Sequence, residues 1–190
     1  KKEYSEYLSS VLVLSFLLFS IAFLITLLCS ESLSNTMKIG NDIVIIAAIS
    51  GFGRFVFDYY NHHLLFQQKY KQKSFLSILK GVSEVVLAIV LVLTVKGPKY
   101  YGRIHSSLII SLGFMLISVV SIFSMSRRFV FAKAWKYAVK IGLPLVPHSL
   151  SGIILSQFDR MAIQRLVGAS ETGLYSFAYS IGMIPLVFLS

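Results

Sequence analysis

Long runs of apolar residues, separated by short polar segments, dominate the pattern along the chain. Residues 11–29 and 106–124 contain no charged residue at all. A helix of about 20 apolar residues crosses the hydrocarbon core of a bilayer, so both runs are predicted to span a membrane. Four more apolar segments carry isolated charges: 42–66, 75–95, about 140–167, and one from about 173 onward. The pattern predicts an all-α, polytopic helical membrane protein with six visible transmembrane helices.

The polar segments between these runs are predicted to be short loops, at 30–41, 67–74 and 96–103. Gly40 and Asn41 are residue types that cap a following helix. None of the loops is long enough to hold a soluble domain.

Composition and charge agree with a membrane protein. Apolar residues make up 56 % of the chain, against about 45–50 % in soluble domains, and the mean hydropathy is +0.76. The net charge is +10. Eleven of the 18 basic residues fall on the side of the first residues and six on the other, which places the start of the chain in the cytoplasm. The charge therefore reports topology, and no nucleic-acid partner is expected.

The basic segment 126–140 differs from the other connections. Lys133, Lys136 and Lys140 share one face of a helix, and Trp135 lies on another face. Basic residues opposite aromatic residues are typical of a helix that lies in the membrane interface against anionic headgroups. The alternative is a solvated linker that is merely basic.

Arg54 is the only basic residue deep within a predicted span, at about 16 Å from its start with a 1.5 Å rise per residue. An arginine at this depth costs about 2.5–3.5 kcal/mol unless it faces protein or water. Asp58 follows one turn later and can offset the charge. Either the two residues only help to pack helices, or Arg54 faces a water-filled cavity and binds an anion.

Other polar residues have simpler interpretations. Lys80 and Glu84 are one turn apart and are predicted to form an ion pair at a helix end rather than a proton relay. His62 and His63 are adjacent and cannot both chelate one metal ion, so neither a metal site nor a cofactor is expected.

Pro144 and Pro147 lie inside the fifth apolar segment, where each removes an amide donor and must kink or unwind a helix. They are predicted to form a hinge, because broken helices recur at hinges and binding sites in transporters. Asp159 and Arg160 follow in the outer third of this span. Adjacent residues diverge around a helix, so these two need different partners.

The segment 142–185 resembles Wzx-type polysaccharide or O-antigen flippases, in the multidrug/oligosaccharidyl-lipid/polysaccharide exporter superfamily. The resemblance rests on three elements, which are Leu143-Pro144-x-x-Pro147-His148-Ser149, Ser156-Gln157-x-Asp159-Arg160 and Gly168-x-x-Glu171-x-Gly173-x-Tyr175.

This resemblance implies 12 to 14 helices in two six-helix bundles. Residues 1–125 would hold the third to sixth helix and end the first bundle. Residues 126–140 would form a basic cytoplasmic linker, and residues 141–190 would begin the second bundle with its seventh and eighth helix. The chain would then be a piece of a longer protein, with residues missing before Lys1 and after Ser190.

The function implied by the resemblance is translocation, not catalysis. An undecaprenyl-diphosphate-linked oligosaccharide, such as an O-antigen or capsule repeat unit, would cross the bacterial cytoplasmic (inner) membrane by alternating access. Its partners would be membrane lipids and, further along the process, a polysaccharide polymerase and a chain-length regulator. The charges expected in the substrate cavity follow from the physical argument alone and are those of Arg54, Asp58, Asp159 and Arg160.

Three alternatives remain open from sequence. A proton- or sodium-coupled drug antiporter of the same superfamily would need acidic residues in the bundle. Asp58 and Asp159 are available, but each has an arginine nearby, which favours the charged carboxylate. A membrane enzyme of glycan assembly would need a clustered catalytic constellation, which the short loops do not offer. A scaffold that does not transport is the third.

Overall fold

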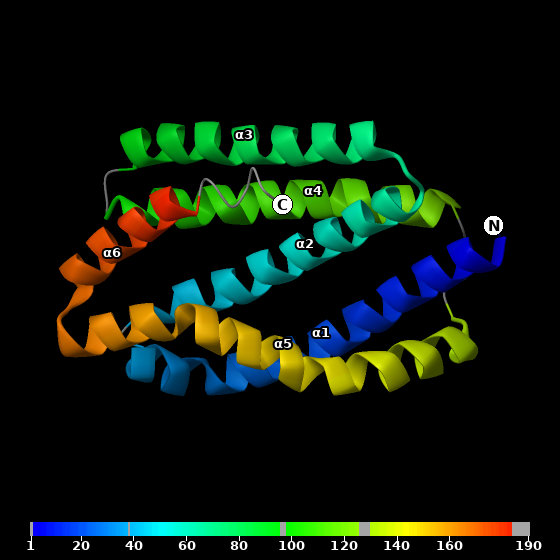
Figure 1. The fold of residues 1–190 in the computed structure, drawn as a ribbon, viewed down its shortest axis with the longest axis horizontal. Coiled ribbons are helices and arrows are strands. Elements are labelled where there is room, and N and C mark those ends of the chain that lie inside the picture. Colours follow the sequence, from blue (N-terminus) through cyan, green and yellow to red (C-terminus); the bar gives the residue numbers. More distant parts are fainter. Residues whose placement is uncertain (1, 38, 96–97, 126–129, 184–190) are drawn as a thin grey trace. The chain divides into compact units, whose positions relative to one another are not determined.

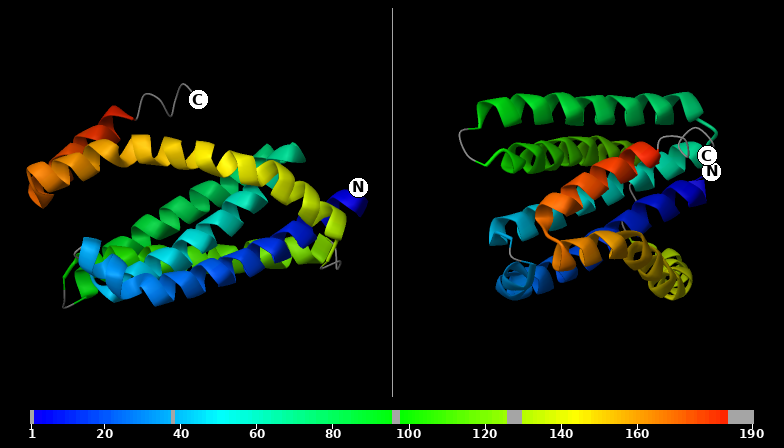
Figure 2. Two further views of the ribbon diagram at one scale, coloured as in Figure 1. Left: turned by 90° about the horizontal axis from the view of Figure 1, so that it is seen from below. Right: turned by 60° about the vertical axis from the view of Figure 1, so that its left-hand side comes forward.

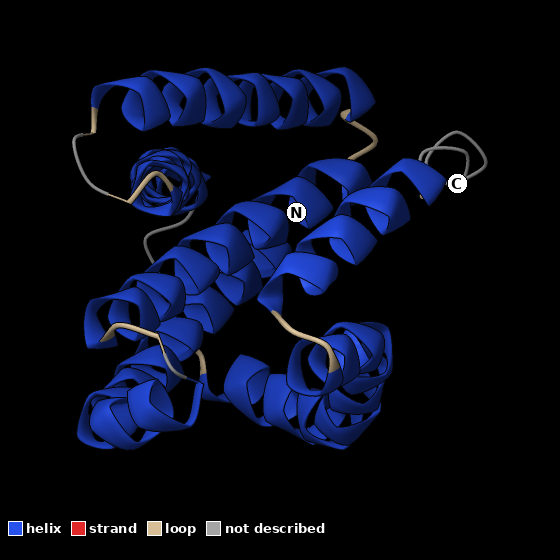
Figure 3. Ribbon diagram, turned by 90° about the vertical axis from the view of Figure 1, so that its left-hand side faces the viewer, coloured by secondary structure: helices blue, strands red, loops and turns tan. Residues whose placement is uncertain are grey.

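The computed structural model describes residues 2–37, 39–95, 98–125 and 130–183, and within these ranges every regular element is an α-helix (Figure 1 and Figure 3). In chain order the six helices are α1 (Lys2–Met37), α2 (Asn41–Phe66), α3 (Tyr70–Thr94), α4 (Tyr100–Met125), α5 (Ala132–Leu166) and α6 (Ala169–Gly182).

Five of these helices, α1 to α5, are long and apolar enough to cross a membrane. The chain is therefore a multi-pass helical membrane protein, as its apolar pattern predicts. The sixth predicted span is represented by α6, and the residues that would continue it, 184–190, lie outside the described residues.

The helix boundaries agree with the predictions in one case and differ in others. Helix α2 begins at Asn41 with Gly40 as its N-cap residue, as predicted. Helices α1 and α3 extend into the polar segments 30–37 and 70–74, which were predicted to be loops. Neither segment contains glycine or proline, so nothing in the local sequence stops helical backbone from continuing.

The chain divides into two compact units, Lys1–Trp135 and Lys136–Ser190. In the first unit α4 packs against both α2 and α3, and α1 packs mainly against α2. The buried apolar core of this unit lies between α1, α2 and α4 and consists of Leu8, Leu12, Val56 and Ile122.

Small residues let α4 approach its neighbours closely. A Cβ atom placed on Gly53 of α2 would lie 3.0 Å from the backbone oxygen of Ser111. One placed on Gly102 of α4 would lie 2.8 Å from the backbone nitrogen of Val92 in α3. Close backbone approach through small residues is the usual way in which helices associate in a membrane.

The outer surfaces of the helices are apolar. Exposed large side chains run along α3 from Phe75 to Leu93, and α1 exposes Leu17, Leu24 and Leu28. In water such continuous apolar surfaces would need another protein to cover them, whereas in a bilayer the lipid tails cover them.

Helix α5 continues through Pro144 and Pro147 without interruption, so unwinding, one of the two predicted effects, does not occur. Figure 2 shows that α5 curves along its length and does not break. A proline cannot donate to the carbonyl four residues earlier, so the carbonyl groups of Lys140 and Leu143 lose their helical donors. The curvature is the remaining effect of the two prolines.

Residues 132–140 of the predicted basic linker are not separated from the following span, because both belong to α5. Residues 126–129 of the linker lie outside the described residues. Its aromatic residues contact α1: the Phe131 amide donates to Ser10 Oγ (2.8 Å), and Trp135 Nε1 donates to the Ser10 carbonyl (2.9 Å). The start of α5 is thus fastened to the first unit.

The second unit contains the rest of α5, followed by α6. The turn between them depends on Gly168, whose φ of 132° is strained for any other residue. Its amide donates to the carbonyl of Ile163 and closes the end of α5. This glycine opens the third element of the family resemblance.

Candidate functional site

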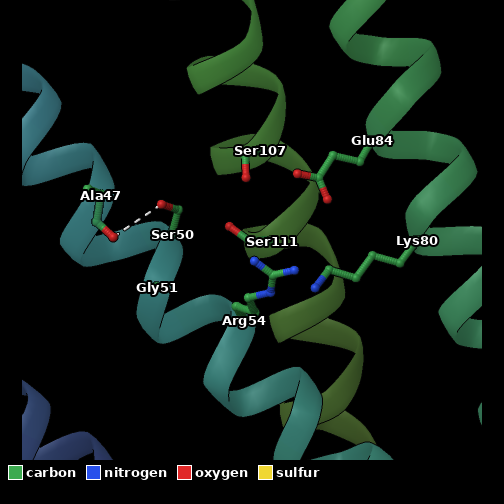
Figure 4. Close-up of a pocket in the computed structure, with 8 residues that line it drawn as sticks. All are labelled: Ala47, Ser50, Gly51, Arg54, Lys80, Glu84, Ser107 and Ser111. Atoms are coloured by element: carbon green, nitrogen blue, oxygen red, sulfur yellow. Dashed lines mark hydrogen bonds between the residues drawn. The ribbon is translucent and has the colours of Figure 1, made fainter. Parts of the chain in front are cut away.

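Three helices of the first unit enclose a pocket of about 160 Å³. Each contributes two polar residues, which are Ser50 and Arg54 from α2, Lys80 and Glu84 from α3, and Ser107 and Ser111 from α4 (Figure 4). In every case the two residues are four apart, one above the other on the same helix face. The pocket lies near the middle of spanning helices, because Arg54 is halfway between Asn41 and Phe66.

Lys80 is the most buried charged residue of this pocket, with 8 % of its surface exposed. Its Nζ lies 4.5 Å from the centroid of the Phe57 ring, a distance at which an aromatic face stabilises a cation. Phe57 is itself held edge-on by Phe114 of α4. The Lys80 amine thus lies near the Phe57 ring and also points toward Arg54 in the pocket (Figure 4).

The amine of Lys80 and the guanidinium of Arg54 point toward one another across the pocket, close to Ser111 (Figure 4). The positive charge of Arg54 acts on Lys80 and is opposed by the negative charges of Asp58 and Glu84. Two cations that converge on one hollow repel each other unless an anion lies between them.

Glu84 occupies the other end of the pocket, where its carboxylate points toward Ser107 (Figure 4). Lys80 and Glu84 were predicted to form an ion pair at the end of a helix, and this interpretation is wrong. Helix α3 begins at Tyr70 rather than at residue 75, so both residues lie well inside it. Within the residues that the structure describes, no ion pair joins them.

Of the four predicted cavity charges, Arg54 alone lines this pocket. Asp58 lies one turn further along α2 and is exposed. Its charge reaches the site through its effect on Lys80. The part of the chain that the structure describes contains no ion pair between Arg54 and Asp58.

Asp159 and Arg160 lie in the second unit, where they contact α6. Tyr175 donates a hydrogen bond to Asp159 Oδ2 (3.1 Å). Arg160 lies over the ring of Tyr179, 4.9 Å from its centroid, and donates to Gln157 Oε1 (3.2 Å). The two residues have different partners, as predicted. The contact of Tyr175 with Asp159 also joins two of the sequence elements that carry the family resemblance.

Of the two adjacent histidines, only His63 takes part in helix packing. His63 is buried between α1 and α2, and its Nδ1 lies 3.2 Å from the Tyr4 hydroxyl, whereas His62 is exposed. Among the described residues, no three His, Cys, Asp or Glu side chains are grouped so that they could hold a metal ion.

The pocket suits an anion that also carries neutral polar groups. Arg54 and Lys80 supply two positive charges against the single negative charge of Glu84, so the lining has an excess of one positive charge. The serine hydroxyls add groups that both donate and accept hydrogen bonds. Hydrogen bonds between these cations and phosphate oxygens would be the strong, charge-assisted kind.

Comparison with known proteins gives one match. A family model described as "Polysaccharide biosynthesis protein" matches residues 1–190. No curated protein matches the chain, and no solved structure matches it.

Proposed function

This chain belongs to the polysaccharide biosynthesis protein family, the family of Wzx-type flippases, and we propose that it translocates a lipid-linked oligosaccharide across the membrane. The substrate class is an oligosaccharide joined through a diphosphate to a polyprenyl lipid such as undecaprenol. The membrane is the bacterial cytoplasmic membrane, and the glycan is an O-antigen or capsule repeat unit. The protein acts as a transporter and not as an enzyme.

The pocket around Arg54 and Lys80 carries this proposal. A lipid diphosphate must take its negative charges through an apolar layer, where each charge is costly unless it is paired. Two cations on adjacent spanning helices provide such pairing, while the lipid tail stays in the bilayer beside the apolar outer surface of the helices.

The same pocket argues against the closest alternative, a drug antiporter. Cationic drugs require an excess of acidic residues, whereas the described lining has two basic residues and one acidic residue. Its electrostatic preference is therefore for an anion.

The mechanism proposed is alternating access between the two bundles of the complete protein. The prolines of α5 provide a flexible region close to the boundary between the two units. Asp159 and Arg160 belong to the second unit, where they would add charge to the cavity of the whole transporter. A polysaccharide polymerase and a chain-length regulator would use the translocated product.

The experiment that tests this function is replacement of Arg54 in the native host. Arg54→Ala removes one charge-assisted contact, worth about 1.5–3 kcal/mol, or about ten- to 150-fold in affinity. We expect surface polysaccharide to be lost while the amount of protein in the membrane is unchanged, and Arg54→Lys to retain part of the activity. Arg103→Ala, an exposed residue near the start of α4, is the matched control. Normal polysaccharide from Arg54→Ala at normal protein levels would refute the proposal.

A further inference from the structure

The pocket has two chemically different ends. Arg54, Lys80 and Ser111 form a cationic end, whereas Glu84 and Ser107 form an end that contains a carboxylate (Figure 4). Lys80 and Glu84 are one turn apart on α3, yet their charged groups point to different ends of the pocket. If the pocket only had to hold a phosphate, the Glu84 carboxylate would weaken binding, because it lies close to the anion.

A carboxylate beside a phosphate site restricts what the ligand carries next to its phosphate. An ionised carboxylate only accepts hydrogen bonds, and a serine hydroxyl both donates and accepts them. A second anionic group at this end would be repelled, whereas a neutral group with several hydroxyl donors would be bound. Adjacent hydroxyls on a sugar ring have this property, since each can donate to the carboxylate.

The size of the pocket limits how much of the ligand is recognised. A volume of about 160 Å³ is large enough for several small polar groups and too small for an oligosaccharide. This is room for a phosphate group and one edge of an attached sugar ring. The rest of an oligosaccharide must extend outside the pocket.

We propose that Glu84, together with Ser107, is a specificity-determining residue that binds the hydroxyl groups of the sugar next to the phosphate held by Arg54 and Lys80. This inference rests on the proposed function and adds a subsite to it. The ligand class is a glycosyl phosphate, in which the hydroxyl-bearing ring directly follows the phosphate.

Binding of three soluble probes to the purified protein tests this subsite. The probes are inorganic phosphate, methyl phosphate, which represents a phosphate ester without free hydroxyl groups, and glucose 1-phosphate. We expect the native protein to bind glucose 1-phosphate about ten-fold more tightly than inorganic phosphate, because hydrogen bonds to a charged acceptor are strong. Methyl phosphate binding as tightly as glucose 1-phosphate would show that the pocket recognises only a phosphate ester, as in a phospholipid, and would overturn the proposal.

Replacement of Glu84 separates recognition of the sugar from simple neutralisation of charge. We expect Glu84→Ala to remove the ten-fold preference for glucose 1-phosphate while phosphate binds as well as before or better. Ser107→Ala should reduce the same preference by a smaller factor. If Glu84 only neutralises Arg54 and Lys80, both Glu84→Ala and Glu84→Gln will tighten all three probes by one common factor, and the subsite does not exist.

The Arg54 variant separates the test of the Glu84 subsite from the test of the proposed flippase function. Arg54→Ala should weaken all three probes together, because each of them carries the phosphate. Loss of phosphate binding in Arg54→Ala, combined with unchanged sugar preference in Glu84→Ala, would leave the flippase proposal standing and remove only the Glu84 subsite. Thermal unfolding of each variant shows whether it is folded, and Glu84→Gln provides a variant of nearly unchanged shape.

Discussion

Pairs of polar residues one helical turn apart mark the site at the scale of single residues. Ser50 with Arg54, Lys80 with Glu84, and Ser107 with Ser111 each interrupt an apolar span at the same spacing. Three such pairs on three helices cannot all face lipid without cost, since polar groups in hydrocarbon need partners. Their common location in one pocket explains why each span carries its pair.

Lys80 provides a test in which function and stability should change in different directions. Lys80→Met keeps an unbranched apolar side chain and removes the buried charge, together with its cation–π contact with Phe57. Replacement of a buried charge by an apolar residue of similar volume is often neutral or stabilising. We therefore expect an unchanged or slightly higher unfolding temperature in detergent and about ten-fold or more weaker binding of inorganic phosphate.

The control for this prediction is Lys99→Met, which changes an exposed lysine just before α4 and should alter neither quantity. A Lys80→Met protein that binds phosphate normally would show that the Lys80 charge is not part of the anion site. A large loss of stability would instead assign the charge a structural role.

The sequence predicts some of these residues and misses others for a physical reason. Arg54 could be singled out because an arginine at the middle of an apolar run is costly unless it faces protein or water. Lys80 was assigned to a helix end because the polar residues before it, 67–74, resemble a loop. The extension of α3 back to Tyr70 moves Lys80 and Glu84 well inside the helix, and a polar segment without glycine or proline does not reveal from sequence whether it is helix or loop.

At the scale of helices, the contact between α3 and α4 depends on Gly102. A methyl group at this position would lie 2.8–3.0 Å from backbone atoms of Leu91 and Val92, and backbone cannot move aside as a flexible side chain does. Gly102→Ala should force the two helices apart and destabilise the protein by about 1–3 kcal/mol, the usual cost of overpacking. Thermal unfolding in detergent measures the change.

Gly113 is the matched control on the same helix, because a Cβ atom there would meet nothing within 4 Å. Gly113→Ala should be neutral or stabilising by up to about 1 kcal/mol, as alanine is the better helix former. Equal destabilisation by the two substitutions would mean that the loss does not come from the α3–α4 contact.

Helix number and type could be predicted well from the apolar pattern, and helix ends less well. The apolar runs at 11–29 and 106–124 are long enough to leave only one interpretation. By contrast, the sequence pattern does not predict that Ala132–Leu166 forms one helix. Two prolines and a run of basic residues favour a break instead. Within a membrane, continued helical bonding on either side of a proline costs less than exposed backbone.

At the scale of the whole molecule, the division between the two units falls at Trp135, directly after the contacts of Phe131 and Trp135 with Ser10. These contacts fix the first residues of α5 to the first unit. Movement of the remaining residues must then begin beyond Trp135. Pro144 and Pro147 follow shortly afterwards, where two carbonyl groups already lack helical donors.

This arrangement predicts that replacement of both prolines will impair transport and leave folding intact. Pro144→Ala with Pro147→Ala restores two backbone hydrogen bonds and stiffens α5, so the protein should be at least as stable and should favour one access state. Labelling of single cysteines with a membrane-impermeant reagent, from each side of the membrane, should then show one side protected and the other open. Pro98→Ala, in the turn before α4, is the control, because it lies far from α5 in sequence and outside any helix. If the double variant and the native protein show the same labelling from both sides, the flexibility needed for alternating access does not lie in this part of α5.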